Sequence, residues 1–276
     1  MAEGLGRGEV VRLLRDHGLH PSRALGQNFL VDPNTARRIV ALAGVAAGDR
    51  VVEVGPGLGS LTVPLAAAGA RVVAVEKDGR LADVLREVTD GLDVEVVEAD
   101  AMRVDWGERL GTQPGWAMVS NPPYNVATPL VVTVLETAPQ IDRLLVMVQK
   151  EVGERLAARP DEEAYGGVSV KVRYWADAAV VGRVPPTVFV PRPSVESALV
   201  AITRRSTPAF DPAVAPYRAI TALVEAGFSQ RRKMLRRSLA GVVSPEQFER
   251  AGVDPTGRAE NLDVADWGRL AAARLP

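Results

Sequence analysis

The run Ser120-Asn121-Pro122-Pro123-Tyr124-Asn125 is the most specific pattern of chemically useful groups in the sequence. The amide oxygen of Asn121 and the carbonyl of Pro122 could accept both N–H bonds of a planar exocyclic amine, such as that of adenine, and so orient its lone pair. Tyr124 offers a flat face on which an extruded base could stack. A β-turn with a packed tyrosine is the alternative. The pattern favours methyl transfer to an amine.

A glycine-rich turn lies upstream and could hold a nucleotide-like cofactor. The apolar run Val51-Val52-Glu53-Val54 leads into Gly55-Pro56-Gly57-Leu58-Gly59 and then into a helix-like segment. Gly55 and Gly57 would let the backbone turn tightly and approach a ligand. Glu76 ends the next apolar run about twenty residues later, where its carboxylate could accept hydrogen bonds from both hydroxyls of a ribose. A tight strand-to-helix connection without a ligand is the alternative.

The spacing of the glycines bears on which cofactor binds. A nicotinamide dehydrogenase would share the turn and the acidic residue, so these two features leave the cofactor open. The sequence has G-x-G-x-G, with Ser60 at the last position of the dinucleotide fingerprint. This spacing favours S-adenosyl-L-methionine over NAD. Asp100, after a third apolar run, could accept a hydrogen bond from the adenine amine of that cofactor, or it could be an ordinary loop carboxylate.

The elements that must position these residues alternate in type between residues 50 and 205. Short β-branched runs, several of them apolar at consecutive positions, predict parallel strands with helices on both faces of the sheet. The expected strands are Val51–Val54, Val72–Glu76, Val94–Val97, Ala117–Ser120, Leu144–Val148, Ala179–Val184 and Ser197–Ile202. The expected helices are Leu58–Ala68, Arg80–Val88, Pro129–Glu136, Glu151–Ala158 and Val168–Trp175. Nearer the N-terminus, Asp32 as N-cap and Pro33 at the first helical position predict a helix over Thr35–Leu42.

After Ile202 the β-branched runs stop, and prolines and glycines separate helical segments. One of these segments, Phe228–Leu239, is basic. Placed on a helix, Arg232, Lys233 and Arg236, together with Arg237, would share one arc, and apolar residues would cluster on another. Such an arc could contact phosphates, or it could be a solvated charged face.

Together these patterns predict an α/β protein. We expect a Rossmann-like S-adenosyl-L-methionine methyltransferase fold with a mostly parallel seven-stranded sheet, followed by a small all-helical C-terminal domain. The expected domains are 1–205, the methyltransferase domain with an N-terminal helical arm, and 206–276, a helical RNA-binding domain.

Composition narrows the class of protein. The 276 residues include no cysteine, which excludes disulfides and thiolate metal ligands and suits a reducing cytoplasm. No apolar run reaches the length of a membrane span or of a signal-peptide core, so we expect a cytoplasmic protein without membrane attachment, and a monomer. His17 and His20 are the only histidines, too few to build a metal site. Because the formal net charge is −1, any nucleic-acid surface must be a local patch.

Several separate signatures, in order along most of the chain, resemble the ribosomal RNA adenine dimethyltransferase family, and in particular its small-subunit branch. They are Leu25-Gly26-Gln27-Asn28-Phe29-Leu30, Val54–Gly59, Asp100-Ala101, Asn121–Asn125, Gln149–Val152, Tyr165-Gly166, Pro185–Pro193, Val195, Ser197-Ala198 and Phe228-Ser229-Gln230-Arg231-Arg232-Lys233. The resemblance implies that S-adenosyl-L-methionine contacts Asn28, Leu30, Gly55, Glu76, Asp100 and Asn121. It also implies that Phe189 lies near the target base, where it could form an aromatic clamp with Tyr124.

The same resemblance implies an N6,N6-dimethylation of two adjacent adenosines in the 3′-terminal hairpin loop of 16S rRNA, within the immature small (30S) ribosomal subunit. Arg231 would join the other basic residues in holding the RNA. The sequence departs from the family pattern at two places. Many relatives carry leucine in place of Pro122, and the basic cluster before the first signature is reduced here to Ser22-Arg23-Ala24.

Three alternatives remain at this point. A resistance methyltransferase acting on 23S rRNA is the nearest, but such relatives generally carry serine where this chain has Gly26. A non-catalytic RNA-binding assembly factor would not need Glu76, Asp100 and Asn121 intact. A small-molecule methyltransferase would leave the basic segment near the C-terminus unexplained.

Overall fold

The computed structural model describes residues 4–22 and 26–275. Arg23, Ala24 and Leu25, named above in the reduced basic cluster and the first signature, lie outside the described residues. The chain forms two compact units, one of Met1–Gly153 with Ala179–Thr203 and the other of Glu154–Ala178 with Arg204–Pro276. The second unit therefore takes in a segment that precedes the expected domain boundary at residue 205.

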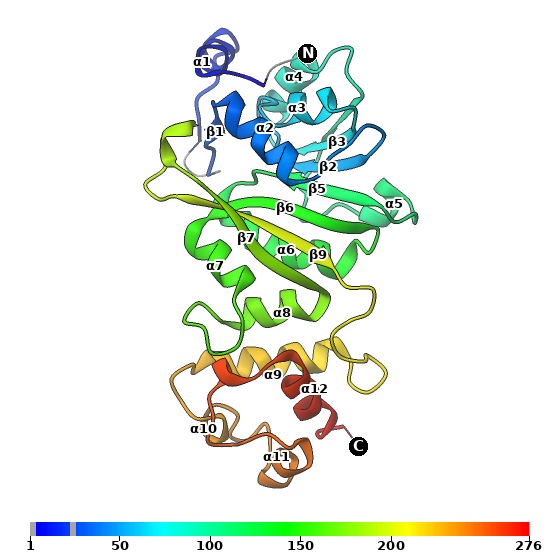
Figure 1. The fold of residues 1–276 in the computed structure, drawn as a ribbon, viewed down its shortest axis with the longest axis vertical. Helices are drawn as coiled ribbons and strands as arrows, with labels where there is room; N and C mark the ends of the chain where they lie inside the picture. The colour runs from blue at the N-terminus through cyan, green and yellow to red at the C-terminus, as the bar shows by residue number, and fades with distance from the viewer. Residues whose placement is uncertain (1–3, 23–25, 276) are drawn as a thin grey trace. The chain divides into compact units, whose positions relative to one another are not determined.

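The first unit is built on a seven-stranded sheet with the order β4-β3-β2-β5-β6-β9-β7 (Figure 1). Neighbouring strands from β4 to β6 are parallel, and β9 runs antiparallel to β6. The bounds are β2(Arg50–Val54), β3(Arg71–Glu76), β4(Val94–Glu98), β5(Trp116–Ser120), β6(Ile141–Gln149), β7(Ala176–Val184) and β9(Ser197–Arg204). The predicted α/β class and all of the expected strands are confirmed.

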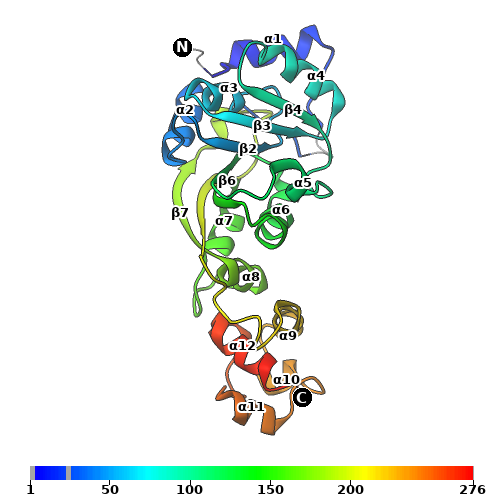
Figure 2. The ribbon, with the colours of Figure 1, turned by 90° about the vertical axis from the view of Figure 1, so that its right-hand side faces the viewer.

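Helices cover both faces of this sheet, which explains why its central strands are apolar at consecutive positions. Every residue of β5 is buried. α2 and α3 lie on one side of the sheet and α5 and α6 on the other (Figure 2). The helix bounds are α2(Pro33–Leu42), α3(Thr62–Ala67), α4(Gly79–Val88), α5(Trp106–Leu110), α6(Tyr124–Thr137) and α7(Lys150–Ala157). The Asp32 side chain accepts a hydrogen bond from the Thr35 N–H at 2.9 Å, as its predicted role of N-cap requires.

Two expected helices begin several residues from the expected position, and the others begin within two residues of it. α3 begins at Thr62 rather than Leu58, because Gly57 and Gly59 have positive φ values and cannot continue a helix. α6 begins at Tyr124 and contains Pro129, which was the expected first residue.

Some short elements were not expected from the sequence. They are α1(Arg7–Asp16), α5, the 3₁₀ turn η1(Pro186–Val188), and the two-residue strands β1(Phe29–Leu30) and β8(Phe189–Val190). β1 and β8 pair antiparallel, with Leu30 opposite Phe189. Two-residue strands are too short to give a periodic pattern in a sequence.

The second unit is helical around a separate apolar core. Its helices are α8(Gly167–Trp175), α9(Tyr217–Ser229), α10(Leu235–Ser238), α11(Pro245–Ala251) and α12(Val264–Ala272), with the 3₁₀ turn η2(Ala259–Asn261). The core includes Tyr165, Tyr174 and Trp267, each almost fully buried. Trp267 packs directly against Gly227 of α9, where a Cβ would lie 2.5 Å from the ring. That contact holds α12 beside α9.

The expectation of one continuous basic helix over Phe228–Leu239 was wrong. α9 ends at Ser229 and α10 begins at Leu235, with a non-helical segment between them. This segment ends in an antiparallel bridge between Met234 and Arg258, and the Leu235 N–H donates to the Gly257 carbonyl at 2.8 Å. Because the backbone groups bond to a distant part of the chain, they cannot form the helical hydrogen bonds that a single arc would require.

Candidate functional site

A cavity of about 520 Å³ opens in the first unit where β2, β3, β4 and β5 end. Parallel strands bring their carboxyl ends to one edge, and β2 lies between β3 and β5, where the strand order reverses; ligands of such sheets bind there. The lining comes from 26–30, 53–57, 75–79, 99–102 and 121–126, with Ser60, Leu61, Leu81 and Leu130. The cavity therefore brings together the first signature, the glycine turn, both acidic strand ends and the Asn-Pro-Pro-Tyr loop.

The glycine turn is shaped by protein neighbours. Gly55 has φ +70°, and a Cβ there would lie 3.1 Å from Cδ of Pro123. Pro123 belongs to Asn121–Asn125, which we call the catalytic loop. Gly57 has φ +58°, and a Cβ there would lie 3.0 Å from the ring of Phe29. Both positions need glycine for the backbone conformation and for the close approach. The turn therefore lets the catalytic loop and the first signature pack against the cavity wall.

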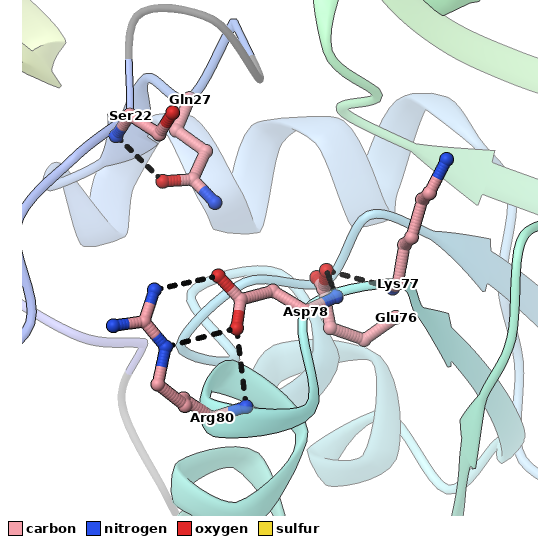
Figure 3. A network of polar contacts seen from close by, with 6 residues as sticks. All are labelled: Ser22, Gln27, Glu76, Lys77, Asp78 and Arg80. Carbon is pink, nitrogen blue, oxygen red and sulfur yellow. Dashed lines mark hydrogen bonds and ion pairs between the residues drawn. The ribbon is translucent and has the colours of Figure 1, made fainter.

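Glu76 lies at the end of β3, and its carboxylate is held by backbone N–H groups, including those of Lys77 and Asp78 (Figure 3). Its oxygens accept from the N–H groups of Gly57 at 3.1 Å, Lys77 at 2.8 Å and Asp78 at 2.9 Å. Burial raises the pKa of this carboxyl, and the backbone donors oppose that effect. Because a carboxylate has about four acceptor positions, three of which are used here, a ribose would find room for one hydrogen bond unless a backbone donor gives way.

Asp100 is held at the cavity wall by Lys77. The two side chains form an ion pair at 2.8 Å, and the Met102 N–H donates to the other carboxylate oxygen at 3.1 Å. The hydrogen bond from Lys77 lowers the pKa of Asp100 below its usual range, so the group is an ionised acceptor. A ligand amine at Asp100 would share that carboxylate with the exposed Lys77 side chain.

Glu53 is a site residue that sequence reasoning missed. It lies on β2, lines the cavity and is 1% exposed. Among the residues that the structure describes, none forms a hydrogen bond with its Oε2 atom. Burial, with a smaller contribution from the nearby Glu76 charge, raises the pKa of Glu53 to about 8. A glutamate inside an otherwise apolar strand was the available signal, because such a residue is rarely buried without a partner.

The side chain of Asn121 is oriented by the first signature. Its Nδ2 donates to the main-chain carbonyl of Asn28 at 3.5 Å, a long hydrogen bond that turns Oδ1 of the same amide away from that carbonyl. The Asn28 side chain donates in turn to the Gly26 carbonyl at 3.1 Å. Asn121 lines the cavity, and its amide oxygen remains available as an acceptor; its role toward an amine stays a prediction.

The rest of the catalytic loop is built around the start of α6. The Pro123 carbonyl accepts from the N–H groups of Val126 at 3.0 Å and Ala127 at 3.2 Å. These helix-starting hydrogen bonds do not use the carbonyl of Pro122, which the sequence assigned as the second acceptor. Tyr124 is the first residue of α6 and lines the cavity, and its hydroxyl lies 2.9 Å from Oγ of Ser197.

Phe189 is placed differently from what the family resemblance implied. It is 1% exposed and belongs to a buried apolar cluster, and it does not line the cavity, whereas its strand partner Leu30 does. The structure therefore brings Tyr124 to the cavity, whereas Phe189 lies in β8 opposite Leu30 of β1 and is not among the lining residues. An aromatic clamp of the two rings stays a prediction.

Gln27 fixes the start of the first signature to the segment before it. The Ser22 N–H donates to Oε1 of Gln27 at 2.8 Å, and the Gln27 N–H donates to the Ser22 carbonyl at 3.1 Å (Figure 3). These paired contacts support the Gly26–Leu30 side of the cavity.

The charges of the lining fit S-adenosyl-L-methionine better than a dinucleotide. The acidic groups of the lining are Glu76, Asp78 and Asp100, with Lys77 as the cation among the described lining residues. Glu53, with a pKa of about 8, is a mostly protonated carboxyl at neutral pH. An acidic wall attracts a sulfonium and an ammonium group and repels a pyrophosphate. The Gly57 N–H is directed at Glu76 and so is not offered to a phosphate. The unpartnered Glu53 oxygen would also gain a partner from a cationic ligand.

In the second unit, the residues expected to hold RNA divide into two kinds. We call Arg231, Arg232, Lys233, Arg236 and Arg237 the basic segment. Its first member forms an ion pair with Glu260 at 2.8 Å and also donates to the Glu163 carbonyl, which are contacts that hold the unit together. The other four are exposed. The structure thus leaves four of the five cations open to solvent.

Two further features concern only the part of the chain that the structure describes. No helix in 4–22 or 26–275 is long and apolar enough to cross a membrane. The same residues contain no group of three or more His, Asp or Glu side chains that could hold a metal ion. His17 lies 3.5 Å from the Glu87 carboxylate.

Solved structures share this fold. A 23S rRNA methyltransferase, ErmE, has a TM-score of 0.67 and 28% identity, covering 89% of this chain and 98% of its own. A dimethyladenosine transferase from Plasmodium falciparum has a TM-score of 0.73 over 88% of this chain and 95% of its own, and at 23% identity it supports the fold alone.

Comparison of sequences gives the family. The protein named Ribosomal RNA small subunit methyltransferase A from Thermobifida fusca is 46% identical over 96% of this chain and 94% of its own length. The protein of that name from Magnetococcus marinus is 43% identical over 98% and 97%. The family model described as Ribosomal RNA adenine dimethylase matches residues 20–273. The chain therefore belongs to the ribosomal RNA adenine dimethylase family, which confirms the resemblance seen in its sequence and the enzyme class that the resemblance implied.

Proposed function

We propose that the protein dimethylates N6 of two adjacent adenosines in the 3′-terminal hairpin loop of 16S rRNA, in the immature small ribosomal subunit, with S-adenosyl-L-methionine as methyl donor. The observation that carries the proposal is that Asn121 and Tyr124 line one acid-lined cavity, with the Asn121 amide nitrogen bonded to the Asn28 carbonyl so that the amide oxygen is left as an acceptor. The names of the relatives support the substrate class. The exact loop follows from the family resemblance of the sequence.

The cofactor would be held along the cavity wall. The glycine turn at Gly55 and Gly57 would approach the cofactor from one side, and the first signature would contact it through Asn28 and Leu30. Its ribose would donate hydrogen bonds to Glu76, and its adenine amine would donate to Asp100. Glu53 adds a buried carboxyl to these residues. When bound, S-adenosyl-L-methionine supplies an electrophilic methyl group on a cationic sulfur.

The residues of the catalytic loop would prepare the amine. The N6 nitrogen of adenine is a weak nucleophile because its lone pair is conjugated with the ring. The Asn121 oxygen and the Pro122 carbonyl accept its N–H bonds and draw the nitrogen out of the plane, which frees the lone pair for in-line attack. Tyr124 stacks on the extruded base. As the nitrogen took the methyl group, the bond between that methyl and sulfur would break with its electron pair left on sulfur, and the nitrogen would lose one proton to water, so no strong base is required.

The exposed part of the basic segment would contact the RNA backbone. Arg232, Lys233, Arg236 and Arg237 can bond to phosphates from solvent without breaking a contact that builds the unit. Phosphate contacts give affinity and orientation, and the folded loop supplies the choice of base. We also propose that the protein is cytoplasmic and monomeric.

Incubation with labelled cofactor and two substrates tests this function. Immature small subunits should accept label and yield N6,N6-dimethyladenosine on digestion and mass spectrometry, whereas large subunits should accept none. Labelling of large subunits instead would favour methylation of 23S rRNA, the activity named for the similar structure ErmE. Tight subunit binding without labelling would favour a non-catalytic assembly factor.

A further inference from the structure

The hydroxyl of Tyr124 has a buried partner on a distant strand. Ser197 is the first residue of β9, and its Oγ lies 2.9 Å from the Tyr124 hydroxyl. The serine is 0% exposed and Tyr124 is partly buried, so the serine end of the bond is shielded from competing water. Burial raises the pKa of the Tyr124 phenol, which keeps it protonated and makes this a bond between neutral groups. A buried serine 73 residues from the tyrosine thus fixes the polar end of its ring.

The anchor is rigid. Ser197 sits opposite Gln149 in the antiparallel pairing of β9 with β6, so its backbone position is set by the sheet. The neighbouring Glu196 carbonyl accepts from the Lys150 N–H at 3.0 Å. Tyr124 begins α6, so its backbone is set by the helix start. With both backbones fixed, the hydroxyl contact restricts the remaining freedom of the ring, which is rotation about its side-chain bonds.

The contact has a counterpart in the same loop. Asn121 is oriented by the Asn28 carbonyl just before β1, and Tyr124 is held by Ser197 at the start of β9. The acceptor and the stacking ring therefore have separate supports. Loss of the serine should affect the ring and leave the amide and the cofactor wall in place.

We propose that Ser197 is a positioning residue, which holds the Tyr124 ring at the angle at which the extruded adenine stacks. This role rests on the proposed function. It predicts that Ser197→Ala slows methylation of immature small subunits by about three- to tenfold, the loss expected for one neutral hydrogen bond. Affinity for S-adenosyl-L-methionine, measured by calorimetry without RNA, should stay within about twofold.

A double-mutant cycle separates positioning from a general loss of packing. Tyr124→Phe keeps the ring and the serine but removes the same bond, so it should slow turnover by a similar factor. The double variant should be no slower than either single one, because the bond can be lost once only. Tyr124→Phe also keeps the proposal testable if Ser197→Ala fails to fold.

A spectroscopic readout reports the ring directly. In a hairpin RNA carrying 2-aminopurine at the target adenine, stacking on Tyr124 should quench the fluorescence on binding, and Ser197→Ala and Tyr124→Phe should both weaken that quenching. Thr89→Val is the matched control, because it removes a hydroxyl that is likewise buried and bonded, to the Leu85 carbonyl at 2.7 Å, outside the site. It should change neither turnover nor quenching.

The outcomes distinguish the two claims. An active wild-type protein with normal turnover and quenching in Ser197→Ala would overturn the role of Ser197 and leave the proposed function standing. Additive losses in the double variant would do the same. A wild-type protein that methylates no ribosomal subunit would overturn both.

Discussion

The cavity of the first unit and the basic segment of the second hold their charges in opposite ways. Glu53 and Glu76 are buried in the cavity wall, and three backbone N–H groups fix the Glu76 carboxylate. Of the basic segment, only Arg231 is tied to other parts of its unit, and the remaining cations are exposed. A buried carboxyl is held in a fixed position and is costly to ionise, whereas exposed cations are adjustable and their charges are screened by salt. We therefore expect pH and packing to govern the cavity, and salt to govern the basic segment.

The largest expected effect in this comparison is the pH dependence of stability due to Glu53. Its pKa is raised from 4.5 to about 8, so between these values the folded protein binds more protons than the unfolded chain. The contribution of Glu53 to stability should therefore be greatest below pH 4.5 and fall as the pH rises toward 8. Relative to Glu53→Gln, the wild type should lose on the order of 3 kcal/mol between pH 5 and 8. Denaturant unfolding of both proteins at several pH values measures this, and parallel curves would contradict it.

The next effect concerns packing at the glycine turn. Gly55→Ala should reduce stability by about 1–3 kcal/mol, because it combines a left-handed backbone with a Cβ 3.1 Å from Pro123. By displacing the catalytic loop it should also lower turnover. Gly44→Ala is the matched control, since Gly44 has φ +60° but no described atom within 4 Å of the added Cβ. It should cost stability by backbone strain alone. Equal turnover in the two variants would show that the close approach to Pro123 is unimportant.

The third prediction addresses the exposed part of the basic segment. Arg232→Ala with Arg236→Ala should weaken binding to immature small subunits and reduce the slope of log K against log salt by about 1 per charge removed. The unfolding midpoint should not move. Arg218→Ala with Arg274→Ala removes the same charge from exposed positions outside the segment and should change the slope less. If the two double variants had the same salt slope, the basic segment would be an ordinary solvated surface that does not bind RNA specifically.

The smallest effect is expected at Arg231. Arg231→Ala should destabilise the protein by about 1 kcal/mol, because its ion pair with the partly exposed Glu260 is screened by solvent but its bond to the Glu163 carbonyl is also lost. Its salt slope for subunit binding should stay near that of the wild type. Thermal unfolding and subunit binding of Arg231→Ala, compared with those of Arg232→Ala, check this prediction. A larger effect of Arg231→Ala on RNA binding than on stability would indicate that Arg231 contacts the RNA.

Prediction from sequence succeeded where local pattern sets local structure. β3 and β5 are buried apolar runs, so their ends could be located, and Glu76 and Asn121 follow from those ends. Asp100 follows from the end of the third run, β4. Position alone did not reveal how many acceptor sites of Glu76 the backbone already uses.

It failed where distant segments decide the structure. The Met234–Arg258 bridge interrupts the expected basic helix. The β1–β8 pairing buries Phe189, although the family signature placed it near the base. The sequence placed Ser197 at the start of a strand and in a signature, but its contact with Tyr124 became evident only in the folded structure.

The central claim is that the Asn121 oxygen activates the amine of the target base. The most direct test is single-turnover methylation of immature small subunits by Asn121→Ala at saturating cofactor, beside Asn34→Ala, which removes an amide that bonds to Arg37 on α2. We expect the rate to fall about a hundredfold or more in Asn121→Ala, with cofactor affinity within about tenfold of the wild type, and no change in Asn34→Ala. A near-normal rate in Asn121→Ala would contradict the account.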